Sequence, residues 1–160
     1  MADKHITLTQ EFLHELFEYR DGELYWKKTN QLAGNIRKHD GYRAIKVKGK
    51  LYKAHRLIFL MFNGFLPKHI DHKDCNRLNN NIENLRPATA TQNNQNSVLR
   101  KDNTSGVKGV IWDKTTEKFG VKIRINGVRR SFGQFYDIDY AKFIADVMRH
   151  KFHGEFSRFK

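Results

Sequence analysis

A two-residue turn signal, Asn126-Gly127, lies between two stretches of alternating side chains and limits the fold of this chain more than any other feature. Asn-Gly favours a type I′ turn, whose twist fits two antiparallel strands. In the preceding stretch, residues 118–125, apolar side chains alternate with basic ones such as Lys122 and Arg124. The stretch VRRSFGQF returns after the turn, and GVKGVIWD supplies a third strand before the hairpin. The pattern predicts a three-stranded antiparallel sheet with one apolar and one basic face.

The segment that follows this sheet has the spacing of an amphipathic helix. Asp137 is a suitable N-terminal cap, and Ala141 and Ala145 are small enough to let the helix approach a sheet closely. The expected apolar stripe consists of large side chains at helical spacing: Tyr140, Phe143, Ile144, Val147 and Phe152. We therefore expect residues 106–160 to form a sheet packed on one helix, with the basic face on the opposite side.

Residues 1–98 show a different order of elements. A helix is expected to start after Thr9 and to end near Arg20-Asp21-Gly22, followed by short strands with glycine turns. The stretch AHRLIFLMFNGFLP indicates a buried helix that stops at Gly64 and Pro67. Four further elements are expected after this helix: a strand HIDHK, a turn-rich loop DCNRLNNNIEN, a strand LRPA and a polar helix TATQNNQNSV. Residues 99–105 are polar and aperiodic and are expected to be a linker, so the sequence predicts an α+β chain with two domains.

The charge of the chain points to an anionic partner. The formal net charge is +13 and the pI is about 9.9, and basic residues outnumber acidic ones in both expected domains. Such a field favours nucleic acid first and an anionic membrane surface second. The longest apolar run, LIFLMF, is too short to span a bilayer, and the first residues lack the apolar core of a signal peptide. The single Cys75 excludes an intramolecular disulfide and fits a reducing cytosol, so we expect a cytoplasmic protein.

Residues 70–96, IDHKDCNRLNNNIENLRPATATQNNQN, combine an Asp-His pair with many Asn side chains. Asn is frequent in turns, and His72 could be an ordinary buried histidine. We assign Asp74 and residues 79–81 to turns. An EF-hand calcium loop does not fit, because the acids are wrongly spaced and the sixth loop position is not Gly.

The chemical interpretation of the Asp-His pair is phosphodiester cleavage. That reaction needs a base for the attacking water and positive charge at the leaving oxygen, and a His beside a carboxylate-bound cation meets both needs. Asp71 and His72 are neighbours on an expected strand, so their side chains point to opposite faces. Oxygen ligands favour Mg²⁺ or Mn²⁺ over zinc.

The same segment resembles the HNH endonucleases of the homing type found in phages and mobile introns. The resemblance runs from YKAHRLIF to the end of IDHKDCNRLNNNIENLRPATATQNNQN. It implies a ββα-metal core over residues 68–96, with His72 as the general base and Asn84 as the Asn that steadies the loop. It also implies a metal ion held by Asp71 and Asn93, where many members carry a His at the last position. Two neighbouring amides compete with Asn93 for that role, namely Asn94 and Asn96.

One further residue of the resemblance lies on the expected buried helix. The His55-Arg56 pair recurs in the family, and Arg56 is either a phosphate contact or a residue that caps the core.

Residues 106–160 resemble the Apetala-two DNA-binding domain of plant ethylene-response factors, through KGV-x-W, KFGVKIRI, SFGQF and the Ala-bearing helix. That resemblance implies a sheet laid in the DNA major groove. Lys108, Arg124 and Arg129 match its cationic contact positions, and Lys122 lies on the same expected face. Ser131 stands where the plant domains have a DNA-contacting Trp, so their base preference does not transfer.

Together these features predict a metal-dependent HNH DNA endonuclease. We expect a nuclease domain at residues 1–98, a linker at residues 99–105 and an Apetala-two type domain at residues 106–160. Double-stranded DNA is the expected partner, with no membrane and no obligate protein partner. One alternative is a DNA-binding regulator with an inactive nuclease site. Another is an RNA-binding module, although the sequence contains no RNA-binding motif that supports it.

Overall fold

The computed structural model describes residues 8–158, and their contacts divide the chain into two compact units, with the division between Ala88 and Thr89. We call them the first unit (residues 8–88) and the second unit (residues 89–158). Residues 1–7 of the expected nuclease domain and residues 159–160 of the expected C-terminal domain lie outside the described residues. The division falls ahead of the domain boundary expected at residue 98, so helix α3 (Ala90–Gln95) belongs to the second unit.

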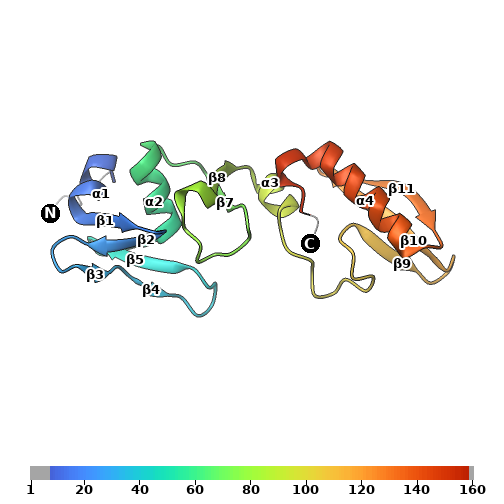
Figure 1. Cartoon of the computed structure of the whole chain (residues 1–160), viewed down its shortest axis with the longest axis horizontal. Coiled ribbons are helices and arrows are strands. Elements are labelled where there is room, and N and C mark those ends of the chain that lie inside the picture. Colours follow the sequence, from blue (N-terminus) through green and yellow to red (C-terminus); the bar gives the residue numbers. More distant parts are fainter. Residues whose placement is uncertain (1–7, 159–160) are drawn as a thin grey trace. The chain divides into compact units, whose positions relative to one another are not determined.

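The first unit mixes two helices with three small antiparallel sheets (Figure 1). Helix α1 (Gln10–Leu16) is followed by a sheet of β1 (Phe17–Arg20), β2 (Glu23–Trp26) and β3 (Gln31–Leu32). A second sheet contains β4 (Asn35–Ile36), β5 (Arg43–Val47) and β6 (Lys50–Lys53), and leads into helix α2 (Ala54–Asn63). The third sheet is a pair, β7 (His69–His72) and β8 (Leu85–Ala88), with a short 3-10 helix η1 (Ile82–Asn84) before β8.

Helix α2 is the centre of the first core because seven of its ten residues are buried. Its buried residues include Leu57, Ile58 and Phe59, and it packs on α1 and on strands β2, β5 and β6. The helix ends where the sequence predicts, since Gly64 adopts the left-handed conformation (φ 71°) that closes helices.

The first helix is shorter than expected. It stops at Leu16 instead of continuing to about Arg20, because residues 17–20 pair as strand β1 with β2. Asp21 (φ 46°) and Gly22 (φ 86°) form the connecting two-residue turn, and two positive φ angles define a turn suited to a hairpin. A Cβ atom on Gly22 would lie 2.8 Å from the backbone nitrogen of Asn81, so this turn packs directly on the loop that precedes η1.

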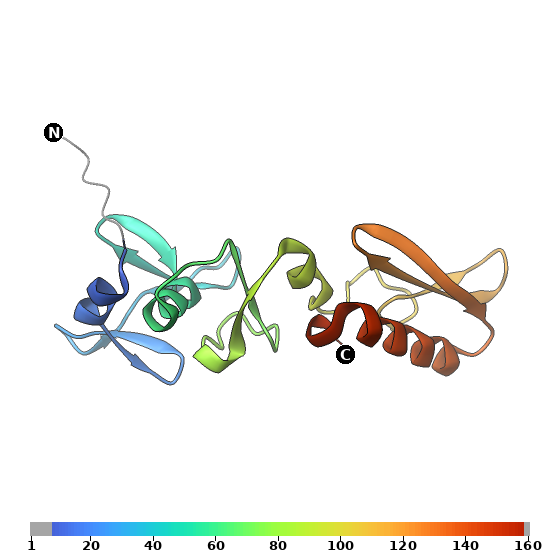
Figure 2. The same ribbon diagram turned by 90° about the horizontal axis from the view of Figure 1, so that it is seen from above.

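The second unit contains the three-stranded sheet predicted from the Asn-Gly turn. Strands β9 (Val110–Asp113), β10 (Lys118–Ile125) and β11 (Val128–Phe135) are antiparallel in the order β11-β10-β9. Helix α4 (Ile138–His153) lies along this sheet, as Figures 1 and 2 show, and a short 3-10 helix η2 (Gly154–Phe156) follows it. The α+β class is therefore confirmed.

The face of α4 that packs on the sheet differs from the predicted stripe. Ala141 and Ala145 are fully buried, while the large side chains Tyr140 and Phe143 are more than half exposed. The small residues occupy the buried face because they let the helix pack closely against Val121 and Ile123 of the sheet. Arg149, one further turn along, continues the same buried line.

Among the described residues, none of the helices combines the length and the apolar character that crossing a bilayer requires.

Candidate active site

The Asp-His pair lies on β7, as the sequence predicts, and β8 completes a two-stranded ribbon. In the register of this ribbon Asp71 pairs with Arg86 and His72 with Leu85. Both members of the Asp-His pair are buried, with 3% of Asp71 and 5% of His72 exposed. Two polar side chains at this depth need specific partners, because burial without hydrogen bonds is costly.

The partner of Asp71 is a buried arginine. The Nη2 and Nε atoms of Arg86 lie 2.8 and 2.9 Å from Oδ2 of Asp71, and Arg86 is only 8% exposed. This pair fixes the carboxylate and leaves neither charge buried alone. Sequence reasoning missed Arg86, whose role depends on a strand register that the motif LRPA does not reveal.

The imidazole of His72 has a different partner. Its Nε2 lies 3.0 Å from Oδ1 of Asn80, which is 1% exposed. In this orientation of the Asn80 amide its oxygen accepts from Nε2, and the neutral ring then has its lone pair on Nδ1. Burial lowers the pKa of His72 below its usual value and outweighs the opposing effects of Asn80, Asp74 and Asp71. A neutral ring near pH 7 is the form that can accept a proton.

This contact corrects the assignment of Asn80 to a simple turn. The signal was hidden because the sequence contains three consecutive Asn residues at 79–81, and only the fold tells which of them turns inward. Asn81 does act as a turn residue, since its side chain accepts from the backbone of Glu83 at the start of η1.

Asn84, expected to steady the loop and the histidine, bonds to the loop. Its Nδ2 donates to Oδ1 of Asp74 (2.9 Å) and to the carbonyl of Asn79 (2.8 Å), and its Oδ1 accepts from the backbone nitrogen of Asp74 (3.1 Å). Asn84 therefore ties together both ends of the 74–84 loop, which carries Asn80.

Arg56 bonds to the backbone of the segment that leads into β7. Its guanidinium donates to the carbonyls of Pro67 and Lys68, both at 3.2 Å. Partial burial lowers the pKa of Arg56. These contacts fit the core-capping role of the two roles left open for this residue.

The remaining expected ligand, Asn93, lies on α3 in the second unit. Thr89 caps this helix through a reciprocal pair of bonds with Gln92. Asn93 and its rival Asn94 are exposed, whereas Asn96 is only 3% exposed. Of the three amides, the two that a ligand can reach are therefore Asn93 and Asn94.

Three of the four DNA-contact residues expected in the second unit share one face of its sheet. Val121 and Ile123 point into the core. Because side chains alternate along a strand, their neighbours Lys122 and Arg124 point outward. Arg124 lies directly opposite Arg129 in the strand register. Like charges directly opposite one another destabilise a sheet, which favours a functional reason for this pair.

Lys108, the fourth expected contact, is bonded to the chain itself. Its Nζ donates to the carbonyls of Gln95 and Ser97 at the end of α3. The backbone carbonyl of Lys108 in turn accepts from the buried Arg149 at 3.0 Å. Lys108 thus supports the segment that follows α3.

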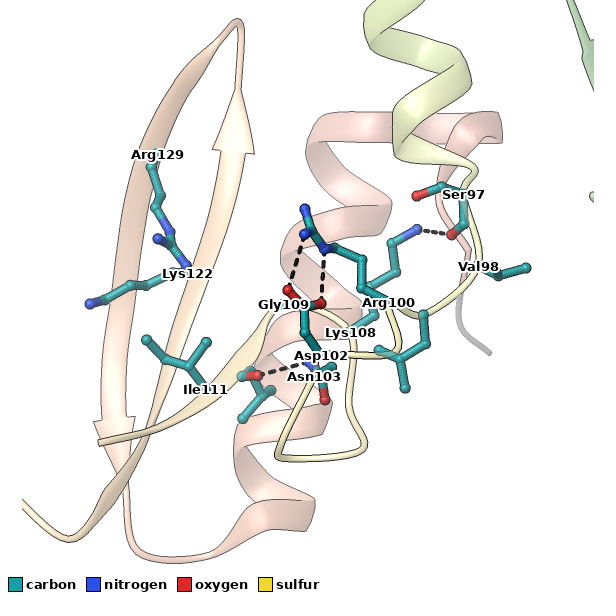
Figure 3. Close-up of a pocket in the computed structure, with 12 residues that line it drawn as sticks. Ser97, Val98, Arg100, Asp102, Asn103, Lys108, Gly109, Ile111, Lys122 and Arg129 are labelled. Carbon is teal, nitrogen blue, oxygen red and sulfur yellow. Dashed lines mark hydrogen bonds and ion pairs between the residues drawn. The ribbon is translucent and has the colours of Figure 1, made fainter. Parts of the chain in front are cut away.

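A groove of about 440 Å³ lies between this segment and the sheet (Figure 3). Lys122 and Arg129 line it from the two long strands, and Arg100, paired with Asp102, lines it from the facing loop. Its cationic lining suits an anionic chain.

No group of three or more His, Cys, Asp or Glu side chains that could hold a metal ion occurs within residues 8–158. Asp71 is a carboxylate, an oxygen donor of the kind that Mg²⁺ and Mn²⁺ prefer.

The buried ion pair generates a prediction about stability. Arg86→Met should lower the free energy of unfolding by about 3–5 kcal/mol, because it leaves the Asp71 carboxylate buried without its partner. Arg20→Met is the matched control, since its pair with Glu18 is exposed and should matter little. Urea unfolding of both variants checks this, and equal losses would mean that burial of the Asp71 pair has no energetic weight.

The sequence of this chain is similar to those of known proteins. Residues 52–95 match the family model described as HNH endonuclease. Protein 3.8 of Escherichia phage T7 is 34% identical over 116 residues, which cover 69% of this chain and 95% of that protein. An uncharacterized HNH endonuclease, L560 of Acanthamoeba polyphaga mimivirus, is 33% identical over 121 residues, or 73% of this chain and 61% of that protein.

Among solved structures, one on DNA binding and cleavage by the HNH homing endonuclease I-HmuI is similar, with 26% identity and a TM-score of 0.44. The match covers 72% of this chain and 71% of that chain. The matched family segment contains the whole β7–β8 ribbon with Asp71, His72 and the loop between the strands. The chain belongs to the HNH endonuclease family and is a nuclease.

Proposed function

We propose that this nuclease is of the homing type and hydrolyses phosphodiester bonds of double-stranded DNA, with His72 as the general base. The observation that carries the proposal is the state of His72, a buried imidazole whose Nε2 bonds to Asn80 and whose pKa is lowered by burial. Such a ring can take a proton from an attacking water at neutral pH. Asp71, next to it on β7, supplies a fixed carboxylate.

The proposed metal site consists of Asp71 and Asn93 and takes Mg²⁺ or Mn²⁺. Carboxylate and amide oxygens are the donors that these ions prefer, and the family segment contains both residues. When bound, such an ion supplies positive charge that offsets the charge developing on the phosphate and on the leaving oxygen. Arg86 holds the Asp71 carboxylate in place, and Asn84 closes the loop beside it.

The second unit is proposed to be the DNA reader, with an Apetala-two type arrangement. Support comes from its three-stranded sheet packed on one helix and from the outward Lys122, Arg124 and Arg129. Because Lys108 and Arg56 bond to backbone carbonyls, any contact they make with DNA is secondary in this proposal.

The base assignment predicts that His72→Ala lowers the cleavage rate by about 10²–10⁴-fold while DNA affinity stays near that of the wild type. His39→Ala, an exposed histidine of the same unit, is the control. Plasmid nicking and gel shift with duplex DNA measure the two quantities. Wild-type cleavage by the His72 variant at pH 7 would remove the imidazole from the reaction.

The metal assignment predicts that chelator abolishes cleavage and that added Mg²⁺ or Mn²⁺ restores it. Asp71→Asn, which keeps an acceptor for Arg86 but loses the charge, should raise the Mg²⁺ concentration needed for half-maximal rate, and Asn93→Ala should do the same. A magnesium titration of the nicking rate measures this. If Asn94→Ala shows the effect and Asn93→Ala does not, the ligand is Asn94 instead.

The DNA-reader assignment predicts a change in salt dependence. Arg129→Ala in the full chain should reduce the slope of log K against log salt by about 0.9, the value for one phosphate contact. Arg130→Ala is the matched control, because it neighbours Arg129 but pairs with the core-facing Ile123 and so belongs to the opposite face. Gel-shift titrations at several salt concentrations compare them, and equal slope changes would refute the assignment of the sheet face.

A further inference from the structure

Two ring side chains from distant parts of the first unit meet the imidazole of His72. His55, on α2, contacts it edge to face, with ring centroids 4.9 Å apart and planes at 80°. Tyr42, just before β5, lies 5.1 Å from the His55 ring and 6.0 Å from the His72 ring. The three rings form one cluster, which we call the ring cluster (Tyr42, His55 and His72).

His55 is a neutral and buried member of this cluster. It is 5% exposed and belongs to the helix that forms the centre of the core. Burial, followed by the nearby His72, lowers the pKa of His55 from 6.5 to about 3. At neutral pH it therefore acts through packing and carries no charge toward His72.

Tyr42 is held in place from its outer side. Nζ of Lys53 lies 3.7 Å from the centroid of the Tyr42 ring, and the Arg77 guanidinium carbon lies 5.2 Å from it. Arg77 also donates to the carbonyl of Asp40 at 2.8 Å, which ties the 73–81 loop to the turn that carries Tyr42. Cation–ring contacts of this kind restrain an aromatic side chain.

The hydrogen bond to Asn80 and the ring contacts act on different parts of His72. The bond places Nε2 beside Oδ1 of Asn80, whereas His55 and Tyr42 contact the ring itself. Contacts with the ring restrict rotation of its plane, and with it displacement of Nδ1. Catalytic groups lose rate steeply when displaced, by as much as about 10²-fold for a shift of about 1 Å.

We propose that His55 and Tyr42 are positioning residues that fix the ring plane of His72 for its role as base. The inference rests on the proposed function and deepens it. A positioning role differs from a simple packing role in what the loss of His55 changes. A packing residue affects only the stability of the fold, whereas a positioning residue also affects the rate of the step that His72 performs.

The test measures the nicking rate at saturating DNA, the DNA affinity and the thermal midpoint for a set of full-length variants. His55→Ala should lower the rate by about 10–100-fold at temperatures well below its midpoint, with DNA affinity unchanged. His55→Phe, which restores a ring of similar size, should recover most of that loss. Phe59→Leu is the stability control, since it weakens the core on the same helix without belonging to the ring cluster.

Two further variants keep the result decisive. If His55→Ala does not fold, Tyr42→Leu carries the test, because Tyr42 is half-buried and lies outside the core helix. In the His72→Ala background, His55→Ala should cause no further loss, because the residue acts only through His72. Additive losses in the double variant, or a rate equal to that of Phe59→Leu, would overturn the positioning role.

The outcome separates this inference from the proposed function. Failure of the wild type to cut DNA, or full activity of His72→Ala, refutes the proposed function itself. Cleavage that requires His72 but proceeds at the wild-type rate in the folded His55 and Tyr42 variants refutes only the role of the ring cluster.

Discussion

Strand β7 places a carboxylate and an imidazole at adjacent buried positions, and the rest of the first unit is organised by the need to satisfy both. Alternation along the strand sends the two side chains to opposite faces, so each requires its own partner. The Arg86 guanidinium, on the opposite strand of the ribbon, forms an ion pair with Asp71. The Asn80 amide, on the connecting loop, forms a hydrogen bond with His72. The many Asn residues of the segment are explained by this loop, which must close tightly and still present one amide inward.

That loop is supported from outside the ribbon. Asn84 joins its two ends, the Tyr19 hydroxyl accepts from the backbone nitrogen of Ile82, and the turn at Gly22 packs on Asn81. The β1–β2 hairpin therefore contributes to the site although none of its residues belongs to the HNH motif.

Sequence patterns predicted what depends on local order and missed what depends on register. The Asn-Gly hairpin, the α2 helix with its Gly64 stop and the β7 strand with its Asp-His pair were all confirmed. Arg86 and Asn80 were missed because their roles follow from strand pairing and loop closure. The α4 stripe was wrong because close approach through Ala141 and Ala145 outweighed the burial of larger side chains.

The proposed role of His72 as the base depends on the state of its ring, a neutral imidazole with its proton on Nε2 and its lone pair on Nδ1. Long-range proton–nitrogen NMR of the free wild-type protein, labelled with ¹⁵N in its histidines, reports the tautomer of each ring directly. At pH 7 the account predicts for His72 a protonated Nε2 and an unprotonated Nδ1. A His72 ring protonated on Nδ1, or on both nitrogens, would contradict it.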